Sequence, residues 1–123
     1  MRLWHVDLLP LLPRPQLLGQ HREVCALRGN GWGKRHSVVD YVFTHRYAYL
    51  HRYHVMVMNE MRRRGYNVDY QWFDREYRGK AIGLDRSHFT QGDWGEYPEH
   101  DAAYMAECVA NLAEKGITLD VAL

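Results

Sequence analysis

The sequence contains little cysteine, no long apolar run and no repetition. Its two cysteines, Cys25 and Cys108, stand among apolar residues in segments of helical pattern. They are typical of buried thiols in a reducing cytosol, and they exclude a disulfide framework and a cysteine-based zinc site. Near the N-terminus, Asp7, Pro10 and Arg14 interrupt the apolar residues, so we expect neither a signal peptide nor a membrane span. The protein is therefore expected to be cytoplasmic.

Internal repeats and low-complexity tracts are also absent from the 123 residues, whose number is typical of one domain. Hydrophobic residues make up 46% of the chain and aromatic residues 13%, which excludes an intrinsically disordered protein. We therefore expect a single domain that covers residues 1–123.

The net charge is small, but the charges are unevenly distributed. Residues 1–66 contain eleven Lys and Arg against four Asp and Glu, a net of +7, whereas residues 67–123 contain five against eleven, a net of −6. This split favours a basic face that binds a polyanion. Charges spread evenly around a compact surface are the alternative interpretation.

Three segments repeat apolar residues at helical spacing and end before a glycine: 15–28, 45–64 and 98–115. They predict an all-α fold. On the first of these helices, Glu23 lies off the main apolar stripe, and Gly19 lies one turn before it. A glycine inside a helix costs about 1 kcal/mol relative to alanine. We therefore expect Gly19 to leave room above the carboxylate for a substrate or another chain segment.

The first nine residues lead into a bend that contains Pro10, Pro13 and Pro15, which we expect to be stiff and extended. This arm either returns the N-terminus over the first helix or simply packs Trp4 on the core. Two later segments also have two possible interpretations each. Residues 38–43 fit a strand or a helical turn, and the aromatic-rich residues 67–83 fit a DNA-contacting loop or a flap over the core.

The segment 28–37 after the first helix combines three glycines with Trp32, Lys34 and Arg35. Its backbone amides are candidates for binding a phosphate. Trp32 is a candidate for stacking on a base, and Lys34 and Arg35 are candidates for contacting the DNA backbone. A helix cap followed by a solvated turn is the alternative.

Four histidines raise the question of a metal site: His36, His45, His51 and His54. No cysteine or acidic residue stands near them at a spacing typical of zinc ligands. We therefore expect no metal ion and no organic cofactor. A metal hydrolase built on these histidines is the least favoured function.

Three motifs occur in order within residues 17–67. Leu17, Arg22 and Glu23 form a Leu-x-x-x-x-Arg-Glu run, Gly33-Lys34-Arg35 forms a basic loop, and Glu60 precedes Arg64-Gly65-Tyr66-Asn67. They resemble the catalytic helix, the basic loop and the Glu-x-x-x-Arg-Gly-aromatic-Asn helix ending of the pyrimidine-dimer DNA glycosylase family. These are small phage-type endonucleases that cut DNA at ultraviolet photoproducts.

The resemblance implies a domain of three helices with the N-terminus threaded between them, and a bifunctional DNA glycosylase and AP lyase. It implies that the terminal α-amine, here of Met1, is the nucleophile and that Glu23 is the essential carboxylate. The expected partner is double-stranded DNA with a damaged or abasic site, bound by a monomer associated with the nucleoid. The expected DNA contacts are Arg2, Gln16, Arg22, Trp32, Lys34 and Arg35.

The chain departs from the family pattern at both ends. In the best-known member the initiator methionine is removed, and an arginine follows the exposed amine. Here Arg2 follows Met1 and should prevent that removal, so the amine stands one residue further from Glu23. The aromatic and basic C-terminal tail of that relative is absent, and residues 70–80 are the candidate substitute.

A terminal amine suits lyase chemistry because its ordinary pKa is about 7.7 to 8, against about 10.4 for lysine. Near pH 7 roughly a tenth of it is free base, so it needs no deep burial to attack the sugar C1′. Glu23 would stabilise developing positive charge and carry protons. A non-catalytic DNA- or RNA-binding module that retains the basic face is the alternative function.

Overall fold

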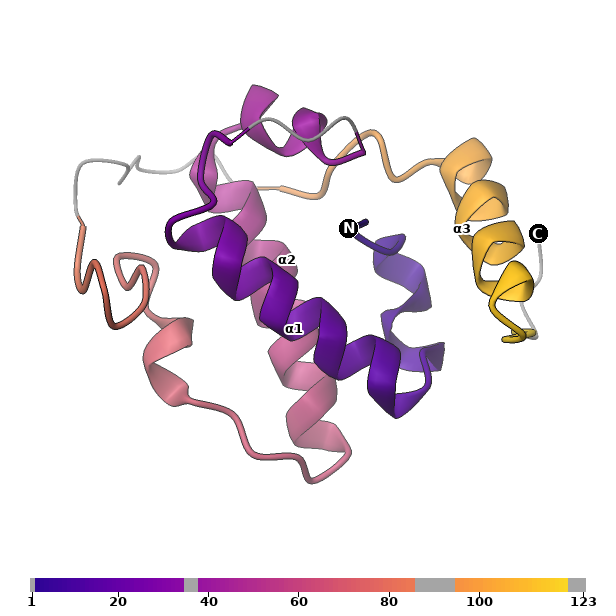
Figure 1. The fold of residues 1–123 in the computed structure, drawn as a ribbon, viewed down its shortest axis with the longest axis horizontal. Helices are drawn as coiled ribbons and strands as arrows, with labels where there is room; N and C mark the ends of the chain where they lie inside the picture. Colours follow the sequence, from indigo (N-terminus) through magenta and orange to yellow (C-terminus); the bar gives the residue numbers. More distant parts are fainter. Residues whose placement is uncertain (1, 35–37, 86–94, 120–123) are drawn as a thin grey trace.

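The computed structural model describes residues 2–34, 38–85 and 95–119 (Figure 1). Its main elements are three α-helices: α1 (Arg14–Arg28), α2 (Tyr47–Arg63) and α3 (Ala102–Glu114). Short 3-10 helices lie before and between them: η1 (Val6–Leu11), η2 (Asp40–Thr44) and η3 (Tyr70–Phe73). No strand occurs within the described residues, which confirms the expected all-α fold. In the same residues, no helix combines the length and the apolar character that a membrane crossing requires.

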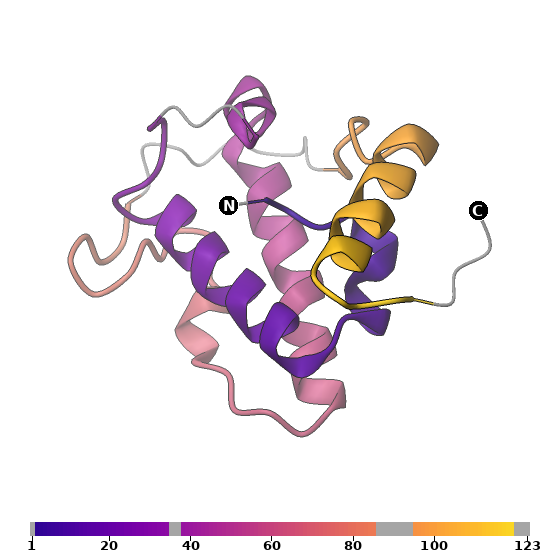
Figure 2. The same ribbon diagram turned by 45° about the vertical axis from the view of Figure 1, so that its right-hand side comes forward.

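Helices α1 and α2 pack against each other at the centre of the molecule (Figures 1 and 2). Leu17 and Val24 of α1 and Leu50 and Val57 of α2 are completely buried. Full burial of one such side chain contributes roughly 1.5–3 kcal/mol, so this contact is the main source of stability that positions the site.

The predicted helix stops are confirmed where glycine is needed. The amide of Gly31 donates to the carbonyl oxygen of Ala26 at 2.8 Å, and a Cβ on Gly31 would lie 2.7 Å from that oxygen. Any larger residue would therefore disturb the end of α1. Gly65, directly after the last turn of α2, has a φ of +82°, a conformation that favours glycine.

The helix starts differ from the prediction by a few residues. Helix α3 begins at Ala102 instead of Pro98, because the Asp101 carboxylate caps it by accepting a hydrogen bond from Tyr104 N at 2.9 Å. Helix α2 begins at Tyr47 instead of His45. The segment 38–43 fitted either a strand or a helical turn in the sequence. Its residues 40–43 form most of the 3-10 helix η2.

The N-terminal arm is only partly extended. Residues 2–5 are free of helix, but the chain then forms η1, which contains Pro10, so the expectation of an extended proline bend was wrong there. Pro10 has no backbone N–H to donate. The hydrogen bond at the end of η1 is donated by Leu12 N to the Leu8 carbonyl oxygen, so it does not involve Pro10. The arm runs between α1 and α3, as Figures 1 and 2 both show.

Candidate active site

The N-terminal arm is fixed by hydrogen bonds to all three α-helices. On α1, Gln20 Nε2 donates to the Arg2 carbonyl oxygen at 3.1 Å, and Gln20 Oε1 accepts from Trp4 N at 2.6 Å. On α2, the Tyr53 hydroxyl donates to the Trp4 carbonyl oxygen at 2.7 Å. On α3, the Tyr104 hydroxyl donates to the Leu3 carbonyl oxygen. The backbone of residues 2–4 is therefore held in one register beside α1.

Glu23 stands next to this arm. Its carboxylate is half-buried, and Oε2 lies 3.4 Å from Gln20 Nε2, the same nitrogen that binds the Arg2 carbonyl oxygen. Glu23 and Arg2 line one pocket of about 290 Å³ together with Trp4, Val38, Asn111 and Lys115. A carboxylate, two cations and an aromatic ring thus face one solvent-filled space.

The far wall of this pocket comes from α3 and the residue that follows it. Asn111 and Lys115 line the pocket, and Glu107 forms an ion pair with Arg2 at 3.0 Å. Arg2, an expected phosphate contact, is thus engaged by a carboxylate of its own chain. Residues 70–80, the expected substitute for a basic tail, pack elsewhere, over the buried side chain of Arg28.

The other expected site residues lie at different depths. Arg22 and Lys34 are exposed, and Gln16 is half-buried in the first turn of α1. Trp32 is half-buried and packs edge-on against Phe43 and Tyr47, with ring centroids 5.1 Å away in both cases. Met1 and Arg35 lie outside the described residues. Their roles, and those of the other expected DNA contacts, stay predictions.

The glycine-rich turn after α1 uses its own amides. Gly29 N donates to Cys25 O, Gly31 N to Ala26 O, Trp32 N to Gly29 O and Lys34 N to Gly31 O. These four amides cap the helix and close the turn, so they do not point outward for a phosphate. Of the two interpretations of this segment, the structure has the helix cap for these four amides.

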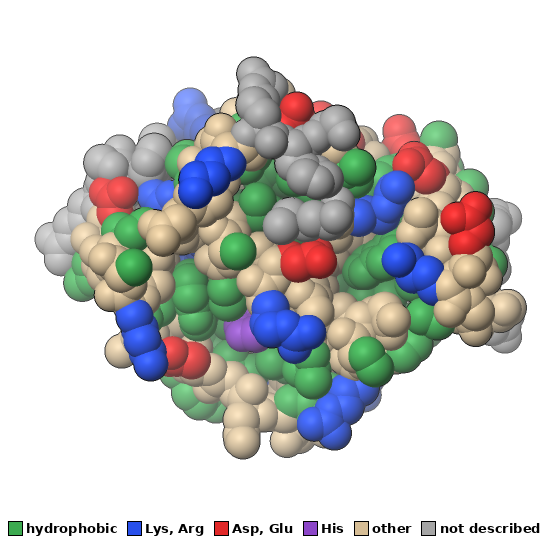
Figure 3. Space-filling model, in the orientation of Figure 1, with side chains coloured by type: hydrophobic (Ala, Val, Ile, Leu, Met, Phe, Trp, Pro, Cys, Tyr) green, Lys and Arg blue, Asp and Glu red, His purple; other side chains and the backbone are tan. Residues whose placement is uncertain are grey.

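The basic first part of the chain is partly neutralised by the acidic second part. Among the described residues, the ion pairs Arg2–Glu107 and Arg52–Glu96 join the two parts, and His45 Nε2 lies 2.8 Å from Glu99 Oε1. On the face shown in Figure 3, the basic side chains lie at several separate places, with acidic side chains between them. The charge split along the sequence therefore reflects intramolecular pairing as well as any affinity for a polyanion.

Arg28 is completely buried, yet all five of its N–H donors are satisfied. Five acceptors lie 2.7–3.2 Å away: the Tyr47 hydroxyl, His54 Nδ1 and the carbonyl oxygens of Trp72, Asp74 and Tyr77. Burial lowers the pKa of Arg28, but these acceptors compensate for the lost water. Arg28 thereby ties the segment that begins at η3 onto α1 and α2, and this segment is a flap over the core.

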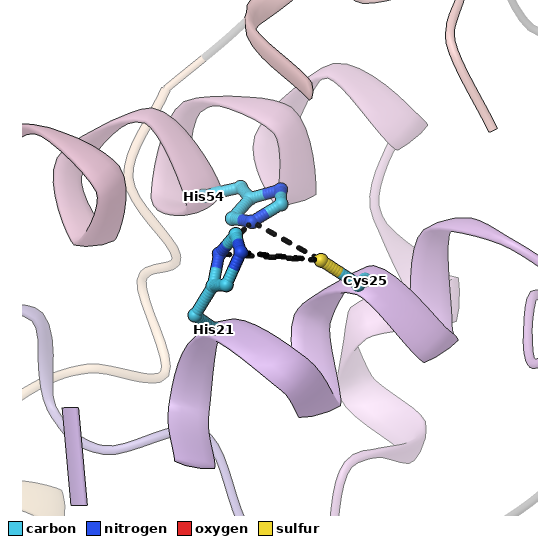
Figure 4. Close-up of side chains that lie close together, drawn as sticks. All are labelled: His21, Cys25 and His54. Carbon is cyan, nitrogen blue, oxygen red and sulfur yellow. Dashed lines mark hydrogen bonds between the residues drawn. The ribbon is translucent and has the colours of Figure 1, made fainter. Parts of the chain in front are cut away.

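A chain of hydrogen bonds leads from Arg28 through His54 to His21 and Cys25 on α1. Figure 4 shows its last three members, His54, His21 and Cys25. Arginine only donates, so His54 Nδ1 must accept from it, and the proton of neutral His54 is on Nε2. That Nε2 lies 2.9 Å from His21 Nδ1, to which it donates. His21 then carries its proton on Nε2, which lies 3.7 Å from Cys25 Sγ.

His21, Cys25 and His54 are close enough to hold a metal ion, with ligand atoms within 4.8 Å of one another. The hydrogen bonds argue against it. A histidine that binds a metal usually donates its other N–H to an acceptor, whereas His54 Nδ1 accepts a hydrogen bond from Arg28. Burial also lowers the pKa of His54 well below its ordinary value and raises the pKa of Cys25 to about 11, which disfavours the thiolate that metals bind.

The histidines considered for a metal hydrolase do not converge where the structure describes them. His45 Nε2 lies 2.8 Å from Glu99 Oε1, His51 Nε2 lies 2.8 Å from the Phe73 carbonyl oxygen, and His54 contacts Arg28 and His21. His36 lies outside the described residues. Each described histidine therefore has a structural partner of its own.

Sequence reasoning missed Gln20 and Arg28. Arg28 falls on the apolar side of the first helix and Gln20 on the other side, but neither polar side chain was expected to be a buried anchor, although their exposed fractions are only 0% and 1%. The one available signal was the spacing of Gln20 and Glu23, which places both on the same side of α1.

Comparison with known proteins gives one match. Residues 1–74 match a family model described as pyrimidine dimer DNA glycosylase. No curated protein and no solved structure matches the chain significantly. The matched residues include α1, α2 and the arm, and they end before α3.

Proposed function

Because the chain belongs to the pyrimidine dimer DNA glycosylase family, we propose that it is a DNA repair glycosylase with AP lyase activity, acting on double-stranded DNA at damaged or abasic sites. The observation that carries this proposal is the fixed arm. Gln20 holds the carbonyl oxygen of Arg2 and contacts the Glu23 carboxylate through one amide nitrogen. These contacts support a site shared by the start of the chain and the acidic side chain.

The nucleophile in this proposal is the α-amine of Met1. Its lone pair attacks the sugar C1′, and the bond from C1′ to the base breaks with its electron pair leaving on the base, which takes up a proton. The ring bond from C1′ to O4′ then opens, O4′ is protonated, and the amine loses its protons to give an imine. No metal or organic cofactor takes part.

Strand cleavage follows by β-elimination from the imine. A base removes a proton from C2′, the electron pair forms the new double bond, and the 3′ phosphate leaves with the electrons of the C3′–O bond. Water then hydrolyses the imine and restores the amine. Glu23 is proposed to stabilise the positive charge that develops on the sugar and to carry protons in these steps.

The proposed DNA contacts surround this site. The exposed Arg22 and Lys34, with Arg35, are expected to bind phosphates, and Arg2 joins them when it leaves Glu107. Gln16 and Trp32 are proposed as further contacts. A damaged, poorly stacked nucleotide lowers the energy needed to bring C1′ to the amine, which is a few kcal/mol.

Borohydride trapping tests the proposal. The protein is incubated with duplexes that carry a thymine dimer or an abasic site, the imine is reduced, and the adduct is mapped by mass spectrometry. We expect the adduct on the N-terminal peptide, and we expect Glu23→Gln to abolish turnover while DNA binding is retained. An adduct on Lys34, Lys80 or Lys115 would contradict the assignment of the nucleophile. Binding without cleavage or adduct would indicate the non-catalytic module.

A further inference from the structure

Gln20 is the residue that joins the arm to the carboxylate. It is almost completely buried, with 1% of its surface exposed, and its side chain contacts four groups. Oxygen Oε1 accepts from Trp4 N at 2.6 Å and lies 2.9 Å from the Tyr53 hydroxyl, whose single proton it shares with the Trp4 carbonyl oxygen. Nitrogen Nε2 donates to the Arg2 carbonyl oxygen at 3.1 Å and approaches Glu23 Oε2 at 3.4 Å.

We propose that Gln20 is a positioning residue for the lyase reaction: it sets the register of the arm, and with it the approach of the terminal amine, against the Glu23 carboxylate. This inference rests on the proposed function. It adds a role to a residue that touches neither the substrate nor the reacting atoms.

The chemistry of the amide explains why this position carries glutamine. Gln20 binds a backbone N–H on one side and a backbone carbonyl oxygen on the other, so it needs an acceptor and a donor on the same planar group. A shift of the arm by one residue would move the Arg2 carbonyl oxygen and the Trp4 N–H away from the amide and would leave buried polar groups without their partners. Such a mismatch in a buried place costs about 1–3 kcal/mol for each unsatisfied group. The amide therefore selects one register.

The same nitrogen also orients Glu23. The second hydrogen on Nε2 points toward the carboxylate while the first binds the arm, so a movement of the arm and a movement of Glu23 are coupled through one rigid group. Among the described residues, the charged or titratable groups near Glu23 include Arg2 from the arm, Lys115 after the end of α3, and Tyr53 on α2. Gln20, like Tyr53, is uncharged.

Gln20→Glu is the most informative variant, because it keeps the size and shape of the side chain. The carboxylate retains both acceptor sites but has no donor, so the bonds to Arg2 O and Glu23 are lost and two carboxylates face each other. We expect the rate of borohydride trapping at saturating protein to fall at least tenfold on an abasic duplex. The dissociation constant for DNA should change less than about threefold, because the Gln20 side chain is buried and not exposed to a bound duplex.

A pH profile separates positioning from a general structural effect. Two neighbouring carboxylates resist ionising together, so the acid limb of the trapping rate should move to higher pH in Gln20→Glu. Tyr53→Phe is the matched control. It removes the one hydroxyl donor that Trp4 O and Gln20 Oε1 share, but leaves the three other contacts of Gln20 in place. Its acid limb should coincide with that of the wild type.

Gln20→Met is the second variant if Gln20→Glu does not fold. It retains the side-chain volume and loses every polar contact, so the borohydride-trapped adduct of this variant should also form at least tenfold more slowly than that of the wild type. A folded Gln20 variant that traps at the wild-type rate with the wild-type pH profile would overturn the role of Gln20. If the wild type itself gives no adduct on its terminal peptide, the proposed function fails instead, and the two failures are distinct.

Discussion

Arg2 of the N-terminal arm and Glu107 of α3 form an ion pair, with Nη1 3.0 Å from Oε1. The Glu107 side chain is 60% exposed, so this pair contributes little to stability, on the order of 0–1 kcal/mol. Helix α3 lies outside the matched residues 1–74. Glu107 therefore restrains Arg2, a proposed phosphate contact, although Glu107 itself lies in a part of the chain that the family match does not cover.

We expect Glu107→Gln to tighten binding to an abasic duplex about two- to fivefold at low salt, because Arg2 can then turn to a phosphate and one repelling charge is removed. The free energy of unfolding should change by less than about 1 kcal/mol. Fluorescence anisotropy at about 50 and 200 mM salt measures the effect and its salt dependence. Glu114→Gln removes the same charge from the same helix but leaves the pair intact. Equal tightening by both variants would contradict a specific role of the pair.

Gly19 offers a second test of where DNA approaches. It lies inside α1, and a Cβ there would meet only the Arg22 guanidinium, at 3.7 Å, among the atoms that the structure describes. No described chain segment fills the space. Gly19→Ala should therefore raise the free energy of unfolding by about 0.5–1 kcal/mol while it weakens DNA binding.

Urea unfolding and anisotropy measure these two effects separately. If DNA uses the space above Gly19, stability and affinity change in opposite directions. A variant that is more stable and binds DNA as tightly as the wild type would show that the substrate does not approach this turn.

The helices could be predicted from the sequence, and the buried polar contacts could not. Pro15, Gly31 and Gly65 act through local backbone geometry, so their effect on α1 and α2 is visible in the sequence. Gln20 and Arg28 bind backbone groups that are distant along the chain. Nothing in a helical pattern identifies a carbonyl oxygen of residue 2 or 77 as a future partner.

The same limit applies to the candidate site. Glu23 was identified through motifs on α1, and the threading of the arm followed from the family resemblance. The contribution of Asn111 and Lys115 depends on how α3 packs against the arm, through Tyr104 and the Arg2–Glu107 pair. That packing is a tertiary contact, and no local pattern in α3 indicates it.

Arg28 should be among the most sensitive residues for stability. Arg28→Met keeps much of the side-chain volume but leaves His54 Nδ1, the Tyr47 hydroxyl and three carbonyl oxygens without their donor. We expect the free energy of unfolding to fall by about 3–5 kcal/mol, a large fraction of the total for a small domain.

Urea unfolding followed by circular dichroism measures the loss. Arg22→Met, on the exposed side of the same helix, is the control and should change stability by less than about 0.5 kcal/mol. A similar effect of the two substitutions would contradict the anchoring role of Arg28.

The free energy of unfolding should decrease as the pH falls, because two half-buried histidines, His51 and His100, take up protons more readily in the unfolded chain. Burial lowers the pKa of His51 and of His100 to about 4. In the unfolded chain these histidines have their ordinary pKa of about 6.5, which is higher than their pKa in the folded protein, so the unfolded chain takes up the protons first. Stability is therefore fully present above about pH 6.5 and is lost as the pH falls toward about 4.

His51→Gln isolates one of these contributions. Its amide can still donate to the Phe73 carbonyl oxygen, which His51 Nε2 approaches at 2.8 Å, but it does not titrate. The free energy of unfolding of this variant should therefore decrease less steeply than that of the wild type between about pH 6.5 and pH 4. Urea unfolding curves at several pH values in this range give both slopes. Equal slopes would mean that His51 does not stay neutral in the folded protein, because a histidine that takes up its proton at the same pH folded and unfolded contributes nothing to the pH dependence.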